Sequence, residues 1–297
     1  MKSDNTFILK TAFTIANKTG AEAVMVYADP LDDLIFKERV AKKFDLILLT
    51  RKKRHEEAEQ DRHSLASFAK CVITLPRISL TRISLIKIGT TLALSQEAVK
   101  PGARIVFAVG GSEAGSLDLI QIVDTSKESE IITGRGITKI SEAVQPELFQ
   151  VILNLAIELA EKGREGKPVG TIFVVGDHEK VLQLSKQMIM NPFKGHDEAE
   201  RNILSGALKD TIREFSTMDG AFVIADDGTV LAAGRYLGAA IDKASVPRGL
   251  GSRHIAAAGI TSLTRALAFV ISESTGDVRI FKDGQIIMHI EKAPPKK

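Results

Sequence analysis

The sequence predicts an α/β protein of two domains. Short apolar segments rich in Val, Ile and Leu recur along its 297 residues, and amphipathic segments of helical length separate them. In the first half these segments are apolar without alternation, which is typical of strands buried on both faces of a mostly parallel sheet. Hairpin signals occur in the second half, so we expect a mixed sheet there. A chain of this length with 44% hydrophobic residues suffices for two ordinary cores.

Charge and cysteine content narrow the class of protein further. The net charge is only +3 and both signs are interspersed, which argues against a nucleic-acid-binding stripe. The single cysteine, Cys71, cannot form an internal disulfide, and we expect it to be a small buried core residue in a reducing compartment. No signal-peptide pattern and no uncharged apolar stretch of about 20 residues is present. We therefore predict a cytoplasmic protein with no nucleic-acid or membrane partner.

Residues 1–124 are predicted to form a three-layer α/β domain. The expected strands are 23–27, 46–50, 71–75 and 104–109. A glycine-rich segment, 110–116, follows the last of them as a phosphate loop would. A dinucleotide fingerprint requires a helix next, whereas residues 117–123 are strand-like. We expect a tight strand connection at this loop.

Residues 125–145 are polar and contain Gly134 and Gly136, so we interpret them as a linker. The second domain, 146–297, then begins with Pro146 at the start of an amphipathic helix. The further elements expected are a strand at 171–176, a helix capped by Asp177 and ending near Met188, a helix at 204–218, and strands at 278–281 and 286–290 joined by a turn at 283–284.

The most informative stretch of the second domain begins with Asp-Gly-Ala at 219–221. Apolar runs at 222–225 and 229–233 follow, and Asp227-Gly228 lies between them. We interpret that pair as a two-residue hairpin turn in which both residues have positive φ. Asp219 would then lie at the open end of the hairpin, where strand backbone holds a carboxylate rigidly.

The second informative motif is Gly-Ser-Arg-His at 251–254, which opens an Ala-rich helix. Ser252 is placed as the N-cap, and glycines before it allow backbone to approach a ligand. Arg253 and His254 lie at the electropositive end of the helix. A cation there costs a few tenths to ~1 kcal/mol of helix stability, so its presence indicates an anion opposite.

A buried strand is expected at 267–271, and residues 272–276 leave it. Glu273 would therefore lie at a strand end, where a carboxylate is suited to bind a divalent cation. Taken singly, each motif also has an ordinary structural explanation. Asp-Gly occurs three times, and a solvated Arg beside a packed His is common.

Four motifs occur together in a characteristic order, at 191–196 (NPFKGH), 219–221 (DGA), 251–257 (GSRHIAA) and 272–276 (SESTG). In this order and spacing they resemble the catalytic domain of the diadenylate cyclases. The resemblance covers the second half of the chain. The later part of the first domain is similar to the C-terminal domain of pyruvate kinase, which precedes the catalytic domain in archaeal diadenylate cyclases.

The resemblance implies an enzyme that condenses two ATP into cyclic di-3′,5′-AMP and releases two pyrophosphates. It also implies that two catalytic domains face each other, so a homo-oligomer is expected, with ATP as substrate and cyclic di-AMP as product. The implied cofactor is Mn²⁺ or Mg²⁺. A histidine ligand favours Mn²⁺, since imidazole is a softer donor than Mg²⁺ prefers.

The site residues follow from matching the motifs to this sequence. The expected catalytic residues are Asp219, Gly220, Arg253 and His254. The expected metal ligands are Asp219, His254 and Glu273. The expected ATP-binding residues are Ala221, Tyr236, Leu237, Gly251, Ser252, Ser272 and Glu273. Among these, Tyr236 and Leu237 are candidates for the adenine pocket, and Ser252 with the helix N-terminus is expected to bind the triphosphate.

Three positions depart from the family pattern. Ile255 replaces an arginine, Ser252 a threonine and Ser274 an acidic residue. Ile255 removes a guanidinium that could bind phosphate, and Arg248 and Lys243 are the nearest cations in sequence that could replace it. Two alternatives stay open at this point: a nucleotide sensor without catalysis, and a scaffold whose first domain binds the functional ligand.

Overall fold

The structure, a computed structural model, describes residues 2–31, 43–52, 65–111, 115–127, 144–238 and 249–292. The chain divides into two compact units, Met1–Gly134 with Ala293–Lys297, and Arg135–Lys292. Most of the predicted linker lies outside the described residues, so its limits stay a prediction. No helix in the described ranges is long and apolar enough to cross a membrane.

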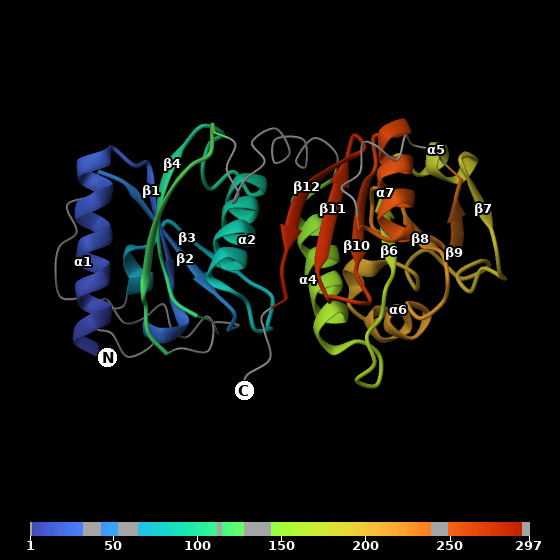
Figure 1. Cartoon of the computed structure of the whole chain (residues 1–297), viewed down its shortest axis with the longest axis horizontal. Coiled ribbons are helices and arrows are strands. Elements are labelled where there is room, and N and C mark those ends of the chain that lie inside the picture. Colours follow the sequence, from blue (N-terminus) through green and yellow to red (C-terminus); the bar gives the residue numbers. More distant parts are fainter. Residues whose placement is uncertain are drawn as a thin grey trace. The chain divides into compact units, whose positions relative to one another are not determined.

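The first unit contains a five-stranded sheet in the order β3-β2-β1-β4-β5 (Figure 1). The pairs β1–β2, β2–β3 and β1–β4 are parallel, and β5 is antiparallel to β4. The elements of the unit are α1 (Lys2–Thr19), β1 (Ala23–Tyr27), η1 (Asp29–Leu31), β2 (Asp45–Thr50), η3 (Leu65–Phe68), β3 (Cys71–Thr74), α2 (Arg82–Ser95), β4 (Arg104–Val109) and β5 (Leu119–Asp124). The predicted mostly parallel sheet is confirmed.

Helices cover both faces of this sheet. Helix α1 packs on β1 and β4, and α2 packs on β3 and β4, with the sheet between the two helices in Figure 1. Every residue of β1 is buried, as its continuous apolar sequence predicts. Strand β3 lies at the sheet edge instead, and there Cys71 is only half-buried. The prediction of a core cysteine is therefore wrong, because an edge strand lacks one neighbour.

The second unit contains a seven-stranded mixed sheet in the order β12-β11-β10-β6-β8-β9-β7. Only β6 and β8 pair in parallel. The elements are α4 (Pro146–Lys162), β6 (Ile172–Val175), α5 (His178–Gln183), β7 (Ser185–Gln187), η4 (Ile203–Ser205), α6 (Lys209–Phe215), β8 (Ala221–Ile224), β9 (Val230–Leu237), α7 (Ser252–Leu263), β10 (Leu267–Ile271), β11 (Val278–Lys282) and β12 (Gln285–Ile290). The predicted mixed sheet is confirmed.

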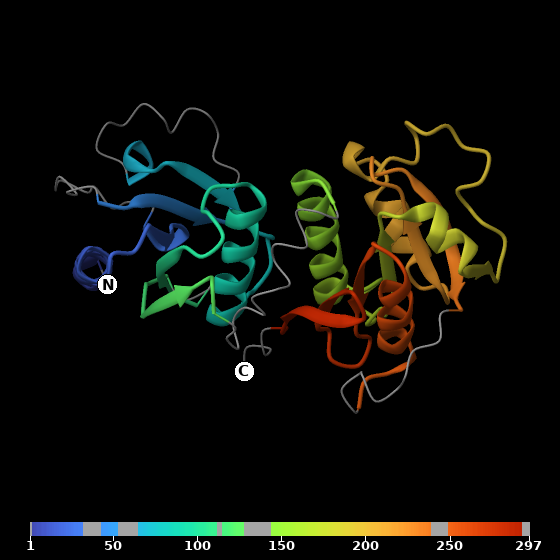
Figure 2. The ribbon, with the colours of Figure 1, turned by 90° about the horizontal axis from the view of Figure 1, so that it is seen from above.

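The two faces of this sheet have different cores, because successive side chains of a strand point to opposite faces. Small and β-branched side chains of β6, β8 and β10 pack with the alanines of α7. The other face is aromatic. The ring of Phe149 from α4 lies 5.5 Å from that of Phe269, and the rings of Phe173 and Phe222 are 5.2 Å apart. The views of Figures 1 and 2 show α4 and α7 on opposite sides of the sheet.

Two helices are shorter than predicted. Helix α5 ends at Gln183 and the chain then forms edge strand β7, whereas we expected the helix to continue to about Met188. Asp177 is the N-cap residue, but it makes no side-chain cap. Its carboxylate accepts instead from the backbone N–H of Arg265, at 2.8 Å. The predicted helix at 204–218 is divided into η4 and α6.

The hairpin of β8 and β9 turns one residue earlier than predicted. The N–H of Gly228 donates to the carbonyl of Ala225 at 3.0 Å, so Asp226 and Asp227 occupy the centre of the turn. Gly228 has φ +89°, whereas Asp227 has no positive φ. A turn followed by a left-handed glycine is the three-residue form of the hairpin, so the predicted two-residue form is wrong.

A long irregular segment between β7 and η4 carries the first family-like motif. The Asn191 amide holds it to β9: Nδ2 donates to the carbonyl of Leu231 at 2.8 Å, and Oδ1 accepts from the N–H of Ala233 at 3.3 Å. Phe193 is buried against Phe215 and Phe222. The motif therefore folds the segment beside the sheet.

Asn191→Ala should lower the free energy of unfolding by about 1–3 kcal/mol, because partly buried groups of Leu231 and Ala233 lose their partners. Urea unfolding of the full chain measures the change. Asn202→Ala is the matched control, since its bonds to Asp227 and Leu204 are exposed. Equal losses in the two variants would contradict the anchoring role of Asn191.

Candidate active site

The candidate site lies along the edge of the seven-stranded sheet that is formed by the ends of its central strands, not beside an edge strand. Strands β6 and β8 are parallel and start at this edge, with Ile172 opposite Ala221. Strand β10 is antiparallel to β6 and ends there, with Val270 opposite Ile172. Asp219, which precedes β8, and Glu273, which follows β10, are thereby brought to the same edge. The family resemblance predicted that these two acids lie close together, and the strand order of the sheet gives the physical reason.

The Arg253 guanidinium lies between the two carboxylates. Its Nη1 is 3.1 Å from Oε2 of Glu273, and its Nη2 is 3.8 Å from Oδ1 of Asp219. The side chains of Asp219 and Glu273 are 86% and 59% exposed, while that of Arg253 is 33% exposed. Because the acids are largely in solvent, these contacts orient the side chains more than they stabilise the fold.

Gly170, just before β6, forms the surface on which this arginine rests. A methyl group at its Cα would lie 2.6 Å from Nη1 of Arg253 and 2.9 Å from Cβ of Glu273. The guanidinium can therefore occupy its place only because residue 170 has no side chain. Gly170 carries no chemical group that a sequence motif could reveal, and we did not predict it.

Two adjoining hollows meet at Ser252 and Arg253. The larger, about 780 Å³, is lined by Gly251, Ser252, Arg253, His254, Ser272, Ser274, Glu273, Ile271, Lys167 and Pro168. The smaller, about 420 Å³, is lined by Ile172, Met188, Asp219, Gly220, Ala221, Arg235, Tyr236, Leu237, Ser252, Arg253 and Ala256. Every site residue predicted above lines one of the two. Their individual roles stay predictions.

The larger hollow has a greater share of polar lining than the smaller one and includes the start of α7. The N-cap of α7 is Gly251, and Ser252 is the first helical residue, so the predicted serine cap is wrong by one position. No side chain caps the helix. The first turn of such a helix is suited to bind an anion through its backbone N–H groups, because no side-chain cap competes for them.

Lys167 also lines the larger hollow, and the sequence analysis missed it. It lies in a tight hairpin in which Arg164 and Lys167 exchange backbone hydrogen bonds of 3.0 and 2.9 Å. Glu165 and Gly166, between them, both have positive φ, as this kind of turn requires. Within the described part of the chain the Lys167 ammonium forms no ion pair. The adjacent Glu-Gly pair was the signal for the turn.

The smaller hollow is more apolar and is bounded by β9. Tyr236 is mostly exposed and Leu237 is buried, and both line this hollow. The guanidinium of Arg235 shapes the neighbouring edge strand: its Nη2 donates to the carbonyls of Leu182 and Ser185, both at 2.7 Å. Burial lowers the pKa of Arg235 without removing its charge.

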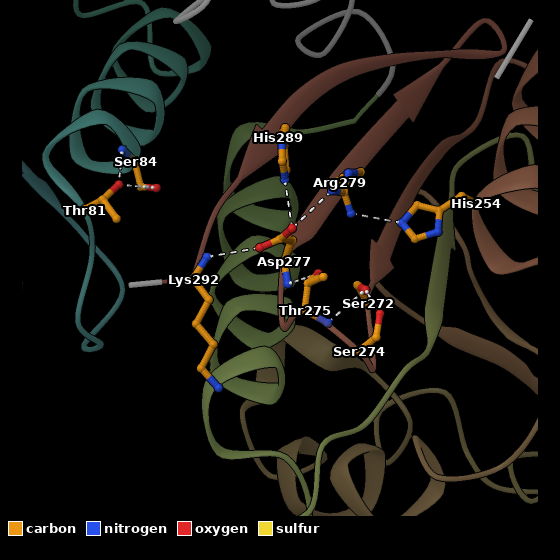
Figure 3. A network of polar contacts seen from close by, with 10 residues as sticks. All are labelled: Thr81, Ser84, His254, Ser272, Ser274, Thr275, Asp277, Arg279, His289 and Lys292. Atoms are coloured by element: carbon orange, nitrogen blue, oxygen red, sulfur yellow. Dashed lines mark hydrogen bonds and ion pairs between the residues drawn. The ribbon is translucent and has the colours of Figure 1, made fainter. Parts of the chain in front are cut away.

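His254 lines the larger hollow but is buried, with only 5% of its surface exposed. Its Nε2 lies 3.3 Å from Nη1 of Arg279, and the two side chains point toward each other from α7 and β11 (Figure 3). A guanidinium only donates, so Nε2 is the acceptor and the proton of the neutral ring is on Nδ1. Burial, followed by the charges of Arg279, His289 and Arg253, lowers the pKa of His254 from 6.5 to about 4.

Comparison with known proteins adds to this geometry. The profile of the family described as "DisA bacterial checkpoint controller nucleotide-binding" matches residues 158–286, and that described as "Probable sensor domain DacZ_P" matches residues 4–133. A diadenylate cyclase of Methanocaldococcus jannaschii is 40% identical over 211 residues, which cover 71% of this chain and 67% of the relative. One of Haloferax volcanii is 38% identical over 209 residues, covering 69% and 74%. The chain belongs to the diadenylate cyclase family.

Membership of the diadenylate cyclase family makes the chain a nucleotidyltransferase. Among solved structures, that of DacA from Staphylococcus aureus is 22% identical, covering 49% of this chain and 87% of that one with a TM-score of 0.35. The "probable sensor domain" profile falls on the first unit. The resemblance of that unit to pyruvate kinase stays a prediction.

The predicted metal ligands of this diadenylate cyclase do not form one cluster. The described residues contain no group of three His, Cys, Asp or Glu side chains placed to hold a metal ion. Arg253 lies between the carboxylates of Asp219 and Glu273. His254 does not fit as a ligand in this arrangement, because Arg279 occupies the lone pair of Nε2 and the proton is on Nδ1.

The arginine that this diadenylate cyclase lacks at Ile255 has one nearby substitute in the described residues. Arg248 and Lys243, our predicted replacements, lie outside those residues. Lys167 lines the larger hollow together with Arg253 and Ser252. It is therefore the described cation best placed to meet a phosphate there.

Gly170→Ala should lower diadenylate cyclase turnover by roughly tenfold or more, because the added methyl would lie 2.6 Å from Nη1 of Arg253, so the guanidinium must shift from its present position. Steady-state rates at several ATP concentrations, beside the thermal unfolding midpoint, measure the effect. Wild-type turnover in a folded Gly170→Ala protein would show that the position of Arg253 is unimportant.

The pH dependence of stability should include a contribution from His254. The folded-state pKa, about 4, lies below the unfolded value of 6.5, so the unfolded chain binds the proton first as pH falls. The free energy of unfolding should therefore fall by about 1–3 kcal/mol between pH 6.5 and pH 4, with no further loss from this group below pH 4. Urea unfolding of wild type and His254→Gln across this range measures it. A wild-type curve parallel to that of the variant would contradict the assignment.

Proposed function

We propose that this chain condenses two ATP molecules into cyclic di-3′,5′-AMP and releases two pyrophosphates, at a face-to-face pair of catalytic units and with a divalent cation. In each half-reaction the 3′-oxygen of one nucleotide forms a bond to the α-phosphorus of the other. The bond from that phosphorus to the oxygen bridging to the β-phosphate breaks, and the hydroxyl proton leaves to solvent or to a nearby base. The family supports the reaction, and the site supports the details that follow.

The observation that carries the proposal is the position of Arg253. It borders both hollows and contacts the two acids, Asp219 and Glu273. One hollow has apolar walls and an aromatic rim, as a nucleobase requires, and the other has a helix start and two cations, as a polyphosphate requires. The α-phosphate of an ATP that occupies both would lie beside Arg253.

In this arrangement Asp219 acts on the attacking hydroxyl and Arg253 on the phosphate. The Asp219 carboxylate is held at the start of β8, because Gly220 has φ +102° and a methyl group there would lie 2.6 Å from the carbonyl carbon of Gly234. Ser252 and Lys167 line the larger hollow, and in our proposal their hydroxyl and ammonium groups bind triphosphate oxygens. Nucleotidyl transfer needs chiefly this alignment and neutralisation of charge.

The exposure of Asp219 supports the pairing of two units. Its side chain is 86% exposed, whereas transfer to a hydroxyl requires exclusion of competing water. A second catalytic unit that covers this edge would supply both the cover and the attacking hydroxyl. A homo-oligomer, at least a dimer, is therefore part of the proposal.

For the divalent cation, the exposed carboxylate of Asp219 fits, together with phosphate oxygens of ATP, since Mg²⁺ is commonly held by one or two carboxylates and substrate phosphates. A cation there supplies charge neutralisation at the reacting phosphate. Without His254 as a ligand, the residues no longer favour Mn²⁺ over Mg²⁺. We propose either metal.

For the first unit we propose a regulatory role, supported by the sensor-domain profile at residues 4–133. The cytoplasmic location likewise stays a prediction.

Asp219→Asn should reduce product formation by at least about 100-fold while the fold is kept, because the side chain is exposed and nearly isosteric. The purified full chain is incubated with ATP and Mg²⁺ or Mn²⁺, and the products are separated and identified by mass. Asp226→Asn is the matched control, since Asp226 is an exposed acid at the opposite end of β8. Wild-type protein that binds ATP but forms no cyclic dinucleotide would falsify the proposal.

A further inference from the structure

A polar network is centred on Asp277, at the junction of the Ser272–Gly276 loop and β11 (Figure 3). Its backbone closes that loop: the N–H of Ser272 donates to the carbonyl of Asp277 at 2.9 Å, and the N–H of Asp277 donates to Oγ1 of Thr275 at 3.3 Å. The loop carries Glu273, which contacts Arg253. The backbone position of Asp277 therefore determines where this acid lies.

The Asp277 carboxylate accepts three hydrogen bonds. Its Oδ2 accepts from Nη2 of Arg279 and from Nε2 of His289, both at 3.1 Å, and its Oδ1 accepts from the backbone N–H of Lys292 at 3.3 Å. The side chains of Arg279 and Asp277 are only 13% and 14% exposed. Burial raises the pKa of Asp277, but the hydrogen bonds from His289 and the other donors outweigh it and lower the pKa overall. The pair is therefore ionised.

Arg279 extends the network to α7. While Nη2 binds Asp277, Nη1 lies 3.3 Å from Nε2 of His254, one residue after Arg253. One guanidinium thus links the closure of the loop that carries Glu273 with the first turn of the helix that carries Arg253. Arg279 does not line either hollow, so it is not the cation that replaces the arginine missing at Ile255.

We propose that Arg279 and Asp277 are positioning residues for nucleotidyl transfer. Their buried pair fixes His254 as its Nδ1–H tautomer. It also keeps the loop that carries Glu273 and the first turn of α7, which carries Arg253, in fixed positions relative to each other. This inference rests on the proposed function of Arg253. The pair acts through His254 and the Glu273 loop and does not touch the substrate.

A purely structural ion pair is the competing explanation, and it predicts effects on stability alone. We therefore compare Arg279→Met with Arg213→Met in the full chain. Arg213 pairs with Glu158 at 3.1 Å in the same unit and lines none of the hollows described above. Arg279→Lys keeps the charge, so it should restore part of the pairing with Asp277.

The first readout does not depend on turnover. In protein labelled with ¹⁵N at histidine, the His254 signals, identified by their absence in His254→Gln, should show Nδ1 protonated and Nε2 unprotonated near neutral pH. Arg279→Met should give a mixture of the two tautomers, and Arg213→Met the wild-type pattern. A wild-type His254 with its proton on Nε2 would overturn the proposal.

The second readout is activity at a temperature where all variants are folded. Arg279→Met should lower the turnover number roughly 10- to 100-fold, and Arg213→Met less than about twofold, because misplacement of an aligning group affects the chemical step. Arg279→Lys should lie between Arg279→Met and wild type. Equal turnover of the two methionine variants, after correction for the folded fraction, contradicts the proposal.

The proposed function and the positioning pair can fail separately. Wild-type protein that makes no cyclic dinucleotide contradicts the former. In that case ATP affinity of the same variants, measured by titration, tests the pair: weaker binding in Arg279→Met than in Arg213→Met supports it, and equal binding contradicts it.

Discussion

The arrangement of the candidate site depends on one guanidinium held in a place that only a glycine leaves open. Arg253 rests on Gly170, contacts Glu273 on one side and Asp219 on the other, and borders both hollows. Four segments far apart in the sequence meet at this group because two parallel strand starts and one antiparallel strand end share a sheet edge. The sheet order of the second unit is thus the precondition for the chemistry.

Charge is distributed around this group in two layers. The outer layer, with Asp219, Glu273 and Lys167, faces solvent, where ion pairs are weak and side chains can exchange partners with a substrate. The inner layer, with Asp277 and Arg279, is buried, and there a broken pair would leave an uncompensated charge. In our proposal the outer side chains exchange partners when a nucleotide binds, while the buried Asp277–Arg279 pair keeps its partners.

Most of the fold could be predicted, because the buried strands are continuously apolar whereas the helices between them alternate apolar and polar residues with helical periodicity. The starts of α4 and α7 were predicted to within a residue, but the type of cap and turn was not: Gly251 in place of Ser252, and Ala225–Gly228 in place of Asp227-Gly228. The observed cap and the observed turn each lie one residue earlier than predicted, and local sequence propensity does not distinguish positions that close. Helix α5 ended early because pairing with β9 favours a strand at Ser185–Gln187.

The lining of the site could be predicted from motifs, whereas its supports could not. Gly170 acts by the absence of a side chain, and Arg279 and Asp277 act through partners more than ten residues away or on another strand. The same long-range pairing removes His254 from the predicted metal ligands, since a neighbouring guanidinium on β11 determines which ring nitrogen carries the proton. The motif predicted that His254 lies in the site, but not that it contacts Arg279.

The glycine N-cap of α7 has a consequence for the thermodynamics of the whole unit. No side chain caps the first turn of α7, so the partial positive charge at this helix N-terminus favours an anion beside Gly251. A nucleotide that binds there would bind only the folded form, so its binding would raise the free energy of unfolding of the unit. If ATP binds at this helix start, as we propose, the midpoint of thermal unfolding should rise with ATP concentration.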